Sequence, residues 1–266
     1  MTKILVETND FRAALISTVA HASNGKFYPS LSRVRLDVGP VNINVLATDN
    51  QTVAWAIVSV VSHIDPELEI IDIGIADVEK ILTVFKGGRS KGDEPEHELC
   101  IETTAQEITI TDASGLFAGE ESLTVLRLPE EEKFPDIPAT FAHAQHSPLR
   151  PVDWLLVADS QIRKFHAAAA CYREPFTFES ISTSSSITIR CGESFIGRMP
   201  QSGLKDTVKE EIARWRSGWD ERIPTPAEVE ATRTEPEPER STGIDLRTAT
   251  GLYAVSNLPS EKDKPE

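Results

Sequence analysis

Cysteine is scarce in this chain, and its few copies are poorly placed for cross-linking. The 266 residues include three cysteines, Cys100, Cys171 and Cys191, which lie far apart and show no Cys-x-x-Cys spacing. An odd number without close spacing predicts neither a disulfide framework nor a zinc ribbon. We therefore expect a cytoplasmic protein, kept in a reducing compartment, with no bound metal or other cofactor.

Long apolar runs are also missing. The longest, such as residues 54–61, fall far short of the roughly 20 residues that a helix needs to cross a bilayer. The first ten residues, MTKILVETND, have an acid at position 7 and no apolar segment, so we expect no signal peptide. A hydrophobic fraction of 39% still predicts a packed core, diluted by some polar segment.

The motifs of common enzyme classes are absent. The sequence has no GxxxxGK[ST] loop, no GxGxxG after a strand, no GxSxG and no HExxH. His143 and His146 lie three residues apart in a polar connector, without an acidic or cysteine ligand beside them. Asp49 follows an apolar run and is better interpreted as a turn residue than as a catalytic acid. We therefore expect a protein that is not an enzyme and has no catalytic residues.

What the chain does contain is a repeated pattern of a strand, a short helix and three strands. The units span residues 1–62, 68–127 and 152–199. Their helices are expected over residues 11–22, 76–85 and 160–172, and Asn9 or Asp10 is expected to cap the first. Repeated βαβββ units predict an α+β fold, with helices on one face and antiparallel sheets on the other.

Two segments do not fit the repeat. Residues 129–150 contain four prolines and are too short for a fourth unit, and the count of three units assumes that they form no helix. Residues 225–241 are polar, acidic and nearly free of large apolar side chains, which predicts a flexible linker. Before this linker, residues 204–219 predict a helix with an apolar face, formed by Leu204, Val208, Ile212 and Trp215.

Charge is unevenly distributed along the chain. The formal net charge of −15 argues against a protein that simply coats nucleic acid. Yet the three helical segments, residues 8–26, 75–91 and 159–173, each carry a net positive charge. If the helices share one surface, that surface can meet the phosphates of a duplex without reading its bases. Ordinary solvated helix faces with incidental lysines and arginines are the alternative interpretation.

Four short motifs follow one another in a specific order. They are KFYPSLSRVRLDVGPVNINVLATDNQTVAWAI at residues 26–57, IADVEKILTVFK at 75–86, LRLPEEEKFPDIP at 126–138 and SFIGRMP at 194–200. In this order they resemble the bacterial DNA polymerase III beta subunits, the DNA sliding clamps. The resemblance covers residues 1–138 and 152–200 and does not extend to residues 201–266.

The resemblance implies the DNA-clamp fold, in which helices line the hole of a closed ring and sheets form its outside. It implies a homo-oligomeric processivity factor that encircles double-stranded DNA, without sequence preference, and tethers the replicative polymerase. Polymerase and clamp loader would dock through short peptide motifs, and no membrane partner is expected. Such a protein would work in the cytoplasm of a bacterial cell and be encoded by the cell or by a phage.

Two sets of site residues follow. The basic residues expected to face the duplex are Arg12, Lys26, Lys80, Lys86, Arg89, Lys91, Arg163, Lys164 and Arg173. The hydrophobic cleft that the family uses for partner peptides would here be lined by Leu155, Leu156, Ile196, Met199 and Pro200. The alternative for these five is plain core packing.

The chain departs from the family in its number of units. A beta subunit has three domains of two units each, whereas three units are counted here. We expect a first clamp domain over residues 1–128, a shortened second domain over 129–200, and a C-terminal helix with an acidic, proline-rich tail over 201–266. The resemblance implies a ring of twelve units. Three chains would close it if each supplies four units, and four chains if each supplies three. A non-catalytic scaffold oligomer is the competing function, because it would use the same sheets only for assembly.

Overall fold

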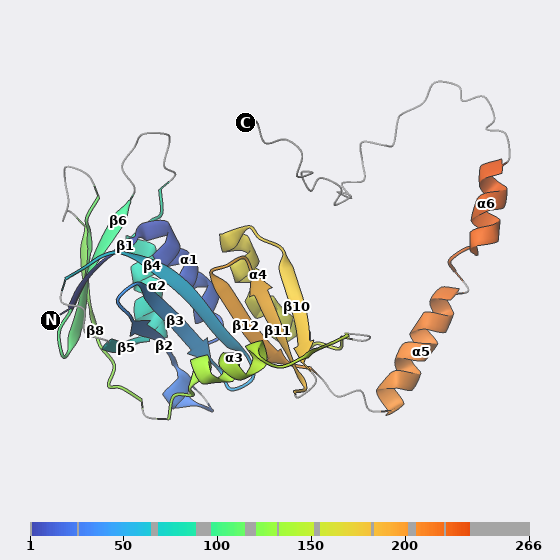
Figure 1. Ribbon diagram of the computed structural model, residues 1–266, viewed down its shortest axis with the longest axis horizontal. Coiled ribbons are helices and arrows are strands. Elements are labelled where there is room, and N and C mark those ends of the chain that lie inside the picture. The colour runs from blue at the N-terminus through green and yellow to red at the C-terminus, as the bar shows by residue number, and fades with distance from the viewer. Residues whose placement is uncertain are drawn as a thin grey trace, which may run out of the picture. The chain divides into compact units, whose positions relative to one another are not determined.

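The computed structural model of the chain consists of two units, Met1–Leu204 and Lys205–Glu266, and each is described by itself (Figure 1). The structure describes residues 2–25, 27–64, 69–88, 97–114, 121–131, 133–151, 155–181, 184–201, 206–220 and 222–234.

The first repeat has the expected order. Its elements are β1 (Thr2–Glu7), α1 (Thr8–Val19), the 3-10 turn η1 (Pro29–Leu31), β2 (Arg33–Val38), β3 (Asn42–Thr48) and β4 (Val53–Ile64). In β1 the side chains of Ile4 and Val6 are buried while Lys3 is exposed, which is the two-residue period of a strand with one face on the core. The helix begins and ends about three residues earlier than predicted. Its N-cap is Glu7, whose carboxylate accepts a hydrogen bond from the Asp10 amide at 2.7 Å, so the cap comes from neither Asn9 nor Asp10.

The second repeat also follows the prediction. It consists of β5 (Glu69–Gly74), α2 (Ile75–Val84), β6 (Glu98–Thr103), β7 (Glu107–Asp112) and β8 (Ser122–Leu126). Val78 and Ile81, three residues apart on one helix face, are buried, while Glu79 and Lys80 between them are exposed. This spacing places the apolar stripe of α2 on the core.

The first two repeats exchange their leading strands. β1 pairs with β6 of the second repeat over Thr2–Glu7 and Glu98–Thr103, while β5 pairs with β2 of the first. The result is two four-stranded antiparallel arrays, β8-β7-β6-β1 and β5-β2-β3-β4, joined where β1 also pairs with the end of β4. Each repeat therefore completes the sheet of the other.

The third repeat is incomplete. It contains α4 (Asp159–Tyr172), β10 (Phe176–Ile181), β11 (Ser186–Cys191) and β12 (Phe195–Pro200), and β12 extends the sheet by pairing with residues 53–56 of β4. The predicted leading strand at 152–157 is wrong over 155–157, which form no strand, and residues 152–154 lie outside the described residues. In the first two repeats the leading strand joins a partner repeat, and the described residues contain no fourth repeat to receive one. The two-residue strand β9 (Leu149–Arg150) pairs with β10 instead.

Residues 129–150 contain a helix, contrary to the prediction. α3 spans Ile137–Gln145, and the Asp136 carboxylate accepts a hydrogen bond from the Ala139 amide at its start. Pro138 lies in the first turn, where its missing amide hydrogen costs no helical hydrogen bond. Ile137 and Phe141 bury one side of α3 against a small core cluster that also includes Leu31, Leu46 and Phe134.

The helices of the three repeats form one layer on the sheet. α1 contacts α2 on one side and α4 on the other, as the ribbon shows (Figure 1). Phe11 of α1 and Phe165 of α4 are fully buried in the main core, which continues into the sheet through residues such as Val58 and Ile189. The predicted α+β architecture of βαβββ units is thus confirmed, with the helices of the three repeats on one face of the sheet and α3 on the other.

The second unit contains two helices, α5 (Asp206–Asp220) and α6 (Pro226–Thr234). The linker prediction is wrong over residues 226–234, which form α6, whereas residues 235–241 lie outside the described residues. α6 begins with a capping arrangement, because the Glu228 carboxylate accepts hydrogen bonds from the amide and hydroxyl of Thr225. Within the described residues, no helix is long and apolar enough to cross a membrane.

Candidate functional site

Two exposed cations of the helix layer are paired within their own helices. The Lys80 ammonium lies 2.8 Å from the Asp77 carboxylate in α2, and the Arg163 guanidinium lies 2.8 Å from the Asp159 carboxylate in α4. Both pairs face solvent, where an ion pair contributes roughly 0–1 kcal/mol. Breaking either ion pair therefore costs little free energy. Either cation can bind a phosphate that approaches this layer instead.

Two further cations lie just beyond the carboxyl ends of these helices. Lys86 follows α2, and Arg173 follows α4 in the left-handed conformation, with φ of 57°. Both side chains are exposed, and neither forms an ion pair with any other residue that the structure describes. They are the most available positive charges of the helix layer.

Arg12 is engaged in holding two helices together. Its guanidinium donates to the carbonyl of Leu82 at 2.7 Å and to that of Phe85, so it satisfies carbonyls at the end of α2 from its position in α1. The side chain is partly buried. The structure thus gives Arg12 a structural role, and its contact with DNA stays a prediction.

Lys164 is engaged in a similar way between the first and third repeats. Its ammonium donates to the Asp49 carboxylate in the turn between β3 and β4. Burial alone would raise the pKa of the Asp49 carboxyl, but hydrogen bonds from Lys164 and from the amides of Gln51 and Thr52 outweigh it and lower that pKa. Asp49 is therefore a turn residue that anchors α4. The remaining predicted cations, Lys26, Arg89 and Lys91, lie outside the described residues.

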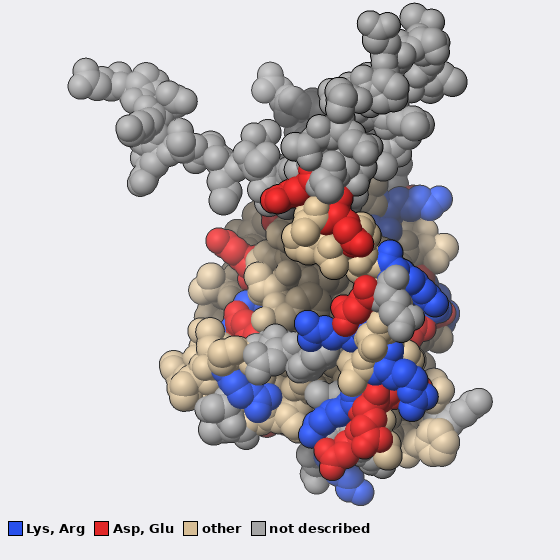
Figure 2. Space-filling model, turned by 90° about the vertical axis from the view of Figure 1, so that its right-hand side faces the viewer, with Lys and Arg blue, Asp and Glu red and all other residues tan. Residues whose placement is uncertain are grey.

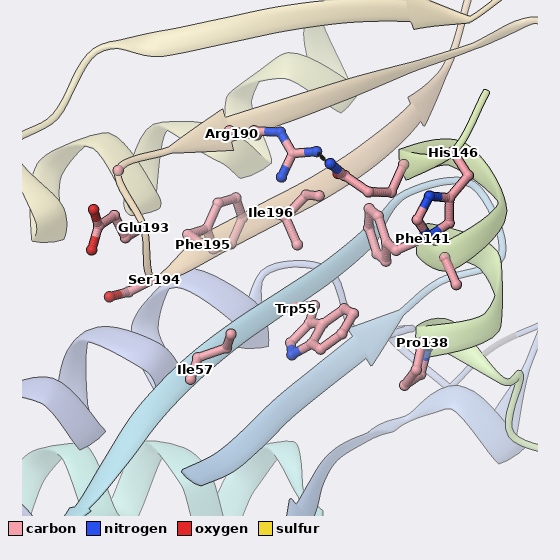
Figure 3. A pocket seen from close by; sticks show the side chains of 13 residues that line it. Trp55, Ile57, Pro138, Phe141, His146, Arg190, Glu193, Ser194, Phe195 and Ile196 are labelled. Carbon is pink, nitrogen blue, oxygen red and sulfur yellow. Dashed lines mark hydrogen bonds between the residues drawn. The ribbon is translucent and has the colours of Figure 1, made fainter. Parts of the chain in front are cut away.

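A second feature is an apolar pocket of about 520 Å³ between α3, β4 and the β11–β12 hairpin. Figure 3 shows Trp55 and Ile57 of β4 on one side, Ile196 of β12 opposite them, and Phe141 of α3 at one end. The ring centroids of Trp55 and Phe141 lie 5.8 Å apart. The arrangement offers a concave apolar surface of the size that takes a few side chains of a ligand.

Polar groups surround this pocket. The Arg190 guanidinium donates to Gln145 of α3 and, at 3.0 Å, to Glu179 of β10. Glu193 and His146 lie at the rim, and the Trp55 indole donates to Asn44 at 3.0 Å. The apolar floor is thus framed by groups that can bind the backbone or charged side chains of a peptide.

The five residues predicted for a peptide cleft lie in different places. Ile196 lines the pocket. Met199 is 1% exposed in the main core, so its side chain is not accessible from this pocket. Leu155, Leu156 and Pro200 are at least partly exposed and lie outside the pocket lining. A role for these residues in partner binding stays a prediction.

Sequence reasoning missed most of the pocket. Trp55 and Ile57 belong to an alternating strand whose outward face had no assigned role, and Phe141 lies in the proline-rich segment 129–150, for which no helix is predicted. The sequence signal that could have predicted the pocket was a tryptophan and an isoleucine on the same face of β4. Such residues on a solvent-directed strand face indicate a covering element or a ligand.

Comparisons with known proteins show which fold this chain shares. No protein-family model matches the sequence, and no curated protein matches it. Among solved structures, the DNA polymerase III beta subunit of Thermotoga maritima matches with a TM-score of 0.58 at 11% identity, over 77% of this chain and 65% of that chain. The chain has the sliding-clamp fold.

Other clamps give the same result. The DNA polymerase sliding clamp of Bacillus subtilis matches with a TM-score of 0.55 at 12% identity, over 76% of this chain and 64% of that one. The DNA polymerase III subunit beta of Borrelia burgdorferi matches with a TM-score of 0.54 at 10% identity, with the same coverages of 76% and 64%. The chain thus spans slightly less than two thirds of these clamps. The resemblance drawn from the four motifs is confirmed as a likeness of fold.

Proposed function

We propose that copies of this chain form a closed ring that encircles double-stranded DNA and holds a polymerase on it, without catalysing a reaction. The observation that carries the proposal is the helix layer. Three helices, one from each repeat, lie side by side on one face of a clamp-fold sheet. Lys80, Lys86, Arg163 and Arg173 give this layer exposed cations. Such a surface suits contacts with phosphates that are independent of sequence.

Ring closure would use the ends of the sheet. β8 pairs only with β7, and residues 176–179 of β10 pair only with β11 among the described strands. Each open edge carries an exposed apolar side chain, Leu126 on β8 and Phe178 on β10. Unpaired edges promote strand addition, so the β8 edge of one copy would pair with the β10 edge of the next. A head-to-tail contact of this kind closes into a ring when the rotation between copies permits.

The apolar pocket is the proposed docking site for polymerase and clamp loader. A short peptide would insert apolar side chains between Trp55, Phe141 and Ile196, while Arg190 and Glu193 bind its polar groups. Polymerase and loader would compete for this pocket. Such a protein would act in the bacterial cytoplasm, and a cell or a phage would encode it.

A non-catalytic scaffold oligomer is the second candidate, and one observation favours it. Arg12 and Lys164 are both committed to internal contacts that join α1 to α2 and α4 to the β3–β4 turn. If the other cations serve only to solvate the helices, the ring would have no reason to bind DNA. The test must therefore change the cations that make no internal contact.

The decisive experiment measures retention on circular DNA. Reversing the two available cations, in Lys86→Glu/Arg173→Glu, should weaken retention on a nicked circle and reduce its dependence on salt, because about two phosphate contacts are lost. The matched control is Lys133→Glu/Arg214→Glu, which reverses two exposed charges outside the helix layer. The clamp function requires that wild-type protein slide off a linear DNA with free ends. Equal retention by both variants would favour the scaffold.

A further inference from the structure

Helix α5 exposes an apolar stripe that the other described residues of its unit leave uncovered, apart from the Arg222 guanidinium, which lies 5.7 Å from the centroid of the Trp219 ring. None of its residues is buried, and Trp215 and Trp219 are each 58% exposed. Val208 and Ile212 lie on the same stripe and are partly exposed. Two half-exposed tryptophans on one helix form the kind of apolar surface that marks an interaction site.

The spacing of this stripe specifies a geometry. Val208, Ile212, Trp215 and Trp219 follow one another at intervals of four, three and four residues. This is the a/d repeat of a coiled coil, with Ile212 and Trp219 at a positions and Val208 and Trp215 at d positions. The positions that face away from this seam hold polar or small residues, among them Glu210, Ala213 and Ser217. A helix of this design buries its stripe against another helix.

The flanking charges specify the partner and its direction. With this register, Glu211 is a g position, and Lys209 and Arg216 are e positions. In a parallel pair of identical helices the g residue faces the e residue five positions later in the partner, which places Glu211 opposite Arg216 twice. In an antiparallel pair Lys209 would face Arg216, and the like charges would repel.

We propose that α5 pairs in parallel with α5 of a second copy of this chain, through the seam of Val208, Ile212, Trp215 and Trp219. A membrane surface is disfavoured, because interfacial helices carry mainly basic residues on their polar face, whereas α5 mixes three basic residues with four acidic ones, Asp206, Glu210, Glu211 and Asp220. The face of the molecule shown in Figure 2 carries basic and acidic side chains interspersed.

The pairing does not depend on the proposed clamp function. Two heptads form a short seam, and isolated helices of about 15 residues are marginal in water. Any other contact between copies would raise the local concentration of α5 and favour the pair. The contact would therefore link copies through a surface separate from the sheet edges of the first unit.

Cysteine cross-linking of the full chain tests the pairing. In a Cys171→Ser background, where Cys100 and Cys191 are buried, Ile212→Cys places a thiol in the seam and Ser217→Cys places one on the opposite face. Under mild oxidation, Ile212→Cys should form disulfide-linked dimers about tenfold faster than Ser217→Cys. Adding Arg216→Glu should slow the Ile212→Cys reaction about fivefold, and Glu211→Arg together with Arg216→Glu should restore it.

Three results would overturn the proposal. Equal cross-linking at 212 and 217 would show that the seam is not an interface. Cross-linking between Val208→Cys and Trp219→Cys chains, mixed with one of them tagged, would show an antiparallel pair. A blue shift of tryptophan fluorescence on anionic vesicles, with no seam cross-linking, would assign the stripe to a membrane surface. Loss of DNA retention leaves all these readouts unchanged, so failure of the clamp function and failure of the pairing are separable.

Discussion

At the scale of single residues, the contacts of the cations set the limit of sequence reasoning. The sequence showed that the helical segments are basic, and the structure places Lys80, Lys86 and Arg163 on exposed surface as that pattern suggests. It did not show that Arg12 reaches carbonyls about 70 positions away, at the end of α2. A contact of that kind depends on how two helices pack, and no local pattern encodes it.

His21 provides a residue-scale prediction about pH. The side chain is fully buried beside Phe165, with ring centroids 4.6 Å apart. Burial, followed by the charge of Lys164, lowers the pKa of His21 from 6.5 to about 3. The unfolded chain therefore takes up this proton first as the pH falls. The stability that the neutral ring contributes is complete above about pH 6.5 and is lost as the pH falls toward 3.

Urea unfolding at several pH values measures this effect. Between pH 6.5 and 3 the free energy of unfolding of the wild type should fall more steeply than that of His21→Leu, by up to about 1.4 kcal/mol per pH unit. The carboxyl groups contribute to both curves and cancel in the difference. Parallel curves for the two proteins would contradict a neutral, buried His21.

Met199 provides a second prediction at this scale. Because its side chain is 1% exposed within the main core, Met199→Ala should lower the free energy of unfolding by about 2–5 kcal/mol. The remaining folded protein should bind a polymerase peptide normally. Chemical denaturation and peptide titration on the same sample separate the two effects. Weaker peptide binding at unchanged stability would instead show that Met199 lines a peptide-binding cleft.

At the scale of elements, the repeat made most of the fold predictable. Local signals predict two complete βαβββ units, together with the helix and three strands of a third. These signals are the apolar residues that alternate in strands and recur every three or four residues in helices. The exceptions each have a non-local cause. The leading strand of the third unit lacks a partner sheet, α3 depends on Asp136 and Pro138 at its start, and α6 depends on the Thr225–Glu228 cap.

The pocket beside α3 gives a prediction about this element. Ala142 is exposed and lines the pocket, whereas the neighbouring His143 is exposed on the same helix and does not line it. Ala142→Trp should fill the pocket and weaken binding of a peptide from the partner polymerase by about tenfold or more. His143→Trp is the matched control and should bind normally. Both variants should keep the wild-type unfolding temperature, because neither changes a buried residue, and equal peptide affinities would exclude the pocket as the docking site.

At the scale of the whole molecule, the open edges of the sheet and the number of repeats together bear on how many copies form the ring. The sequence pattern predicts three units. The structure describes two complete repeats and a third without its leading strand. α3 adds a helix between the second and third repeats, which the count of three had assumed absent. Neither α3 nor the two-residue β9 makes up a fourth unit, but together they occupy the chain where part of one would lie.

The number of repeats in each chain determines how many copies close the ring. The resemblance implies a ring of twelve units. On that expectation, chains that each count as two domains close as a trimer, and chains that supply three units close as a tetramer. We favour the trimer, because α3 and β9 lie between β8 and β10 in the sequence, where part of a fourth unit would lie. With them, the chain counts as two domains. In an Ile212→Glu background, where pairing of α5 cannot add copies, light scattering at several protein concentrations should give a mass near three chains. A variant that also blocks the β10 edge, Phe178→Pro, should dissociate this ring by removing a backbone donor. Thr177→Ser on the same strand is the control and should leave the mass unchanged. A mass near four chains would support the simple unit count, and a monomer at every concentration would contradict a self-assembled ring.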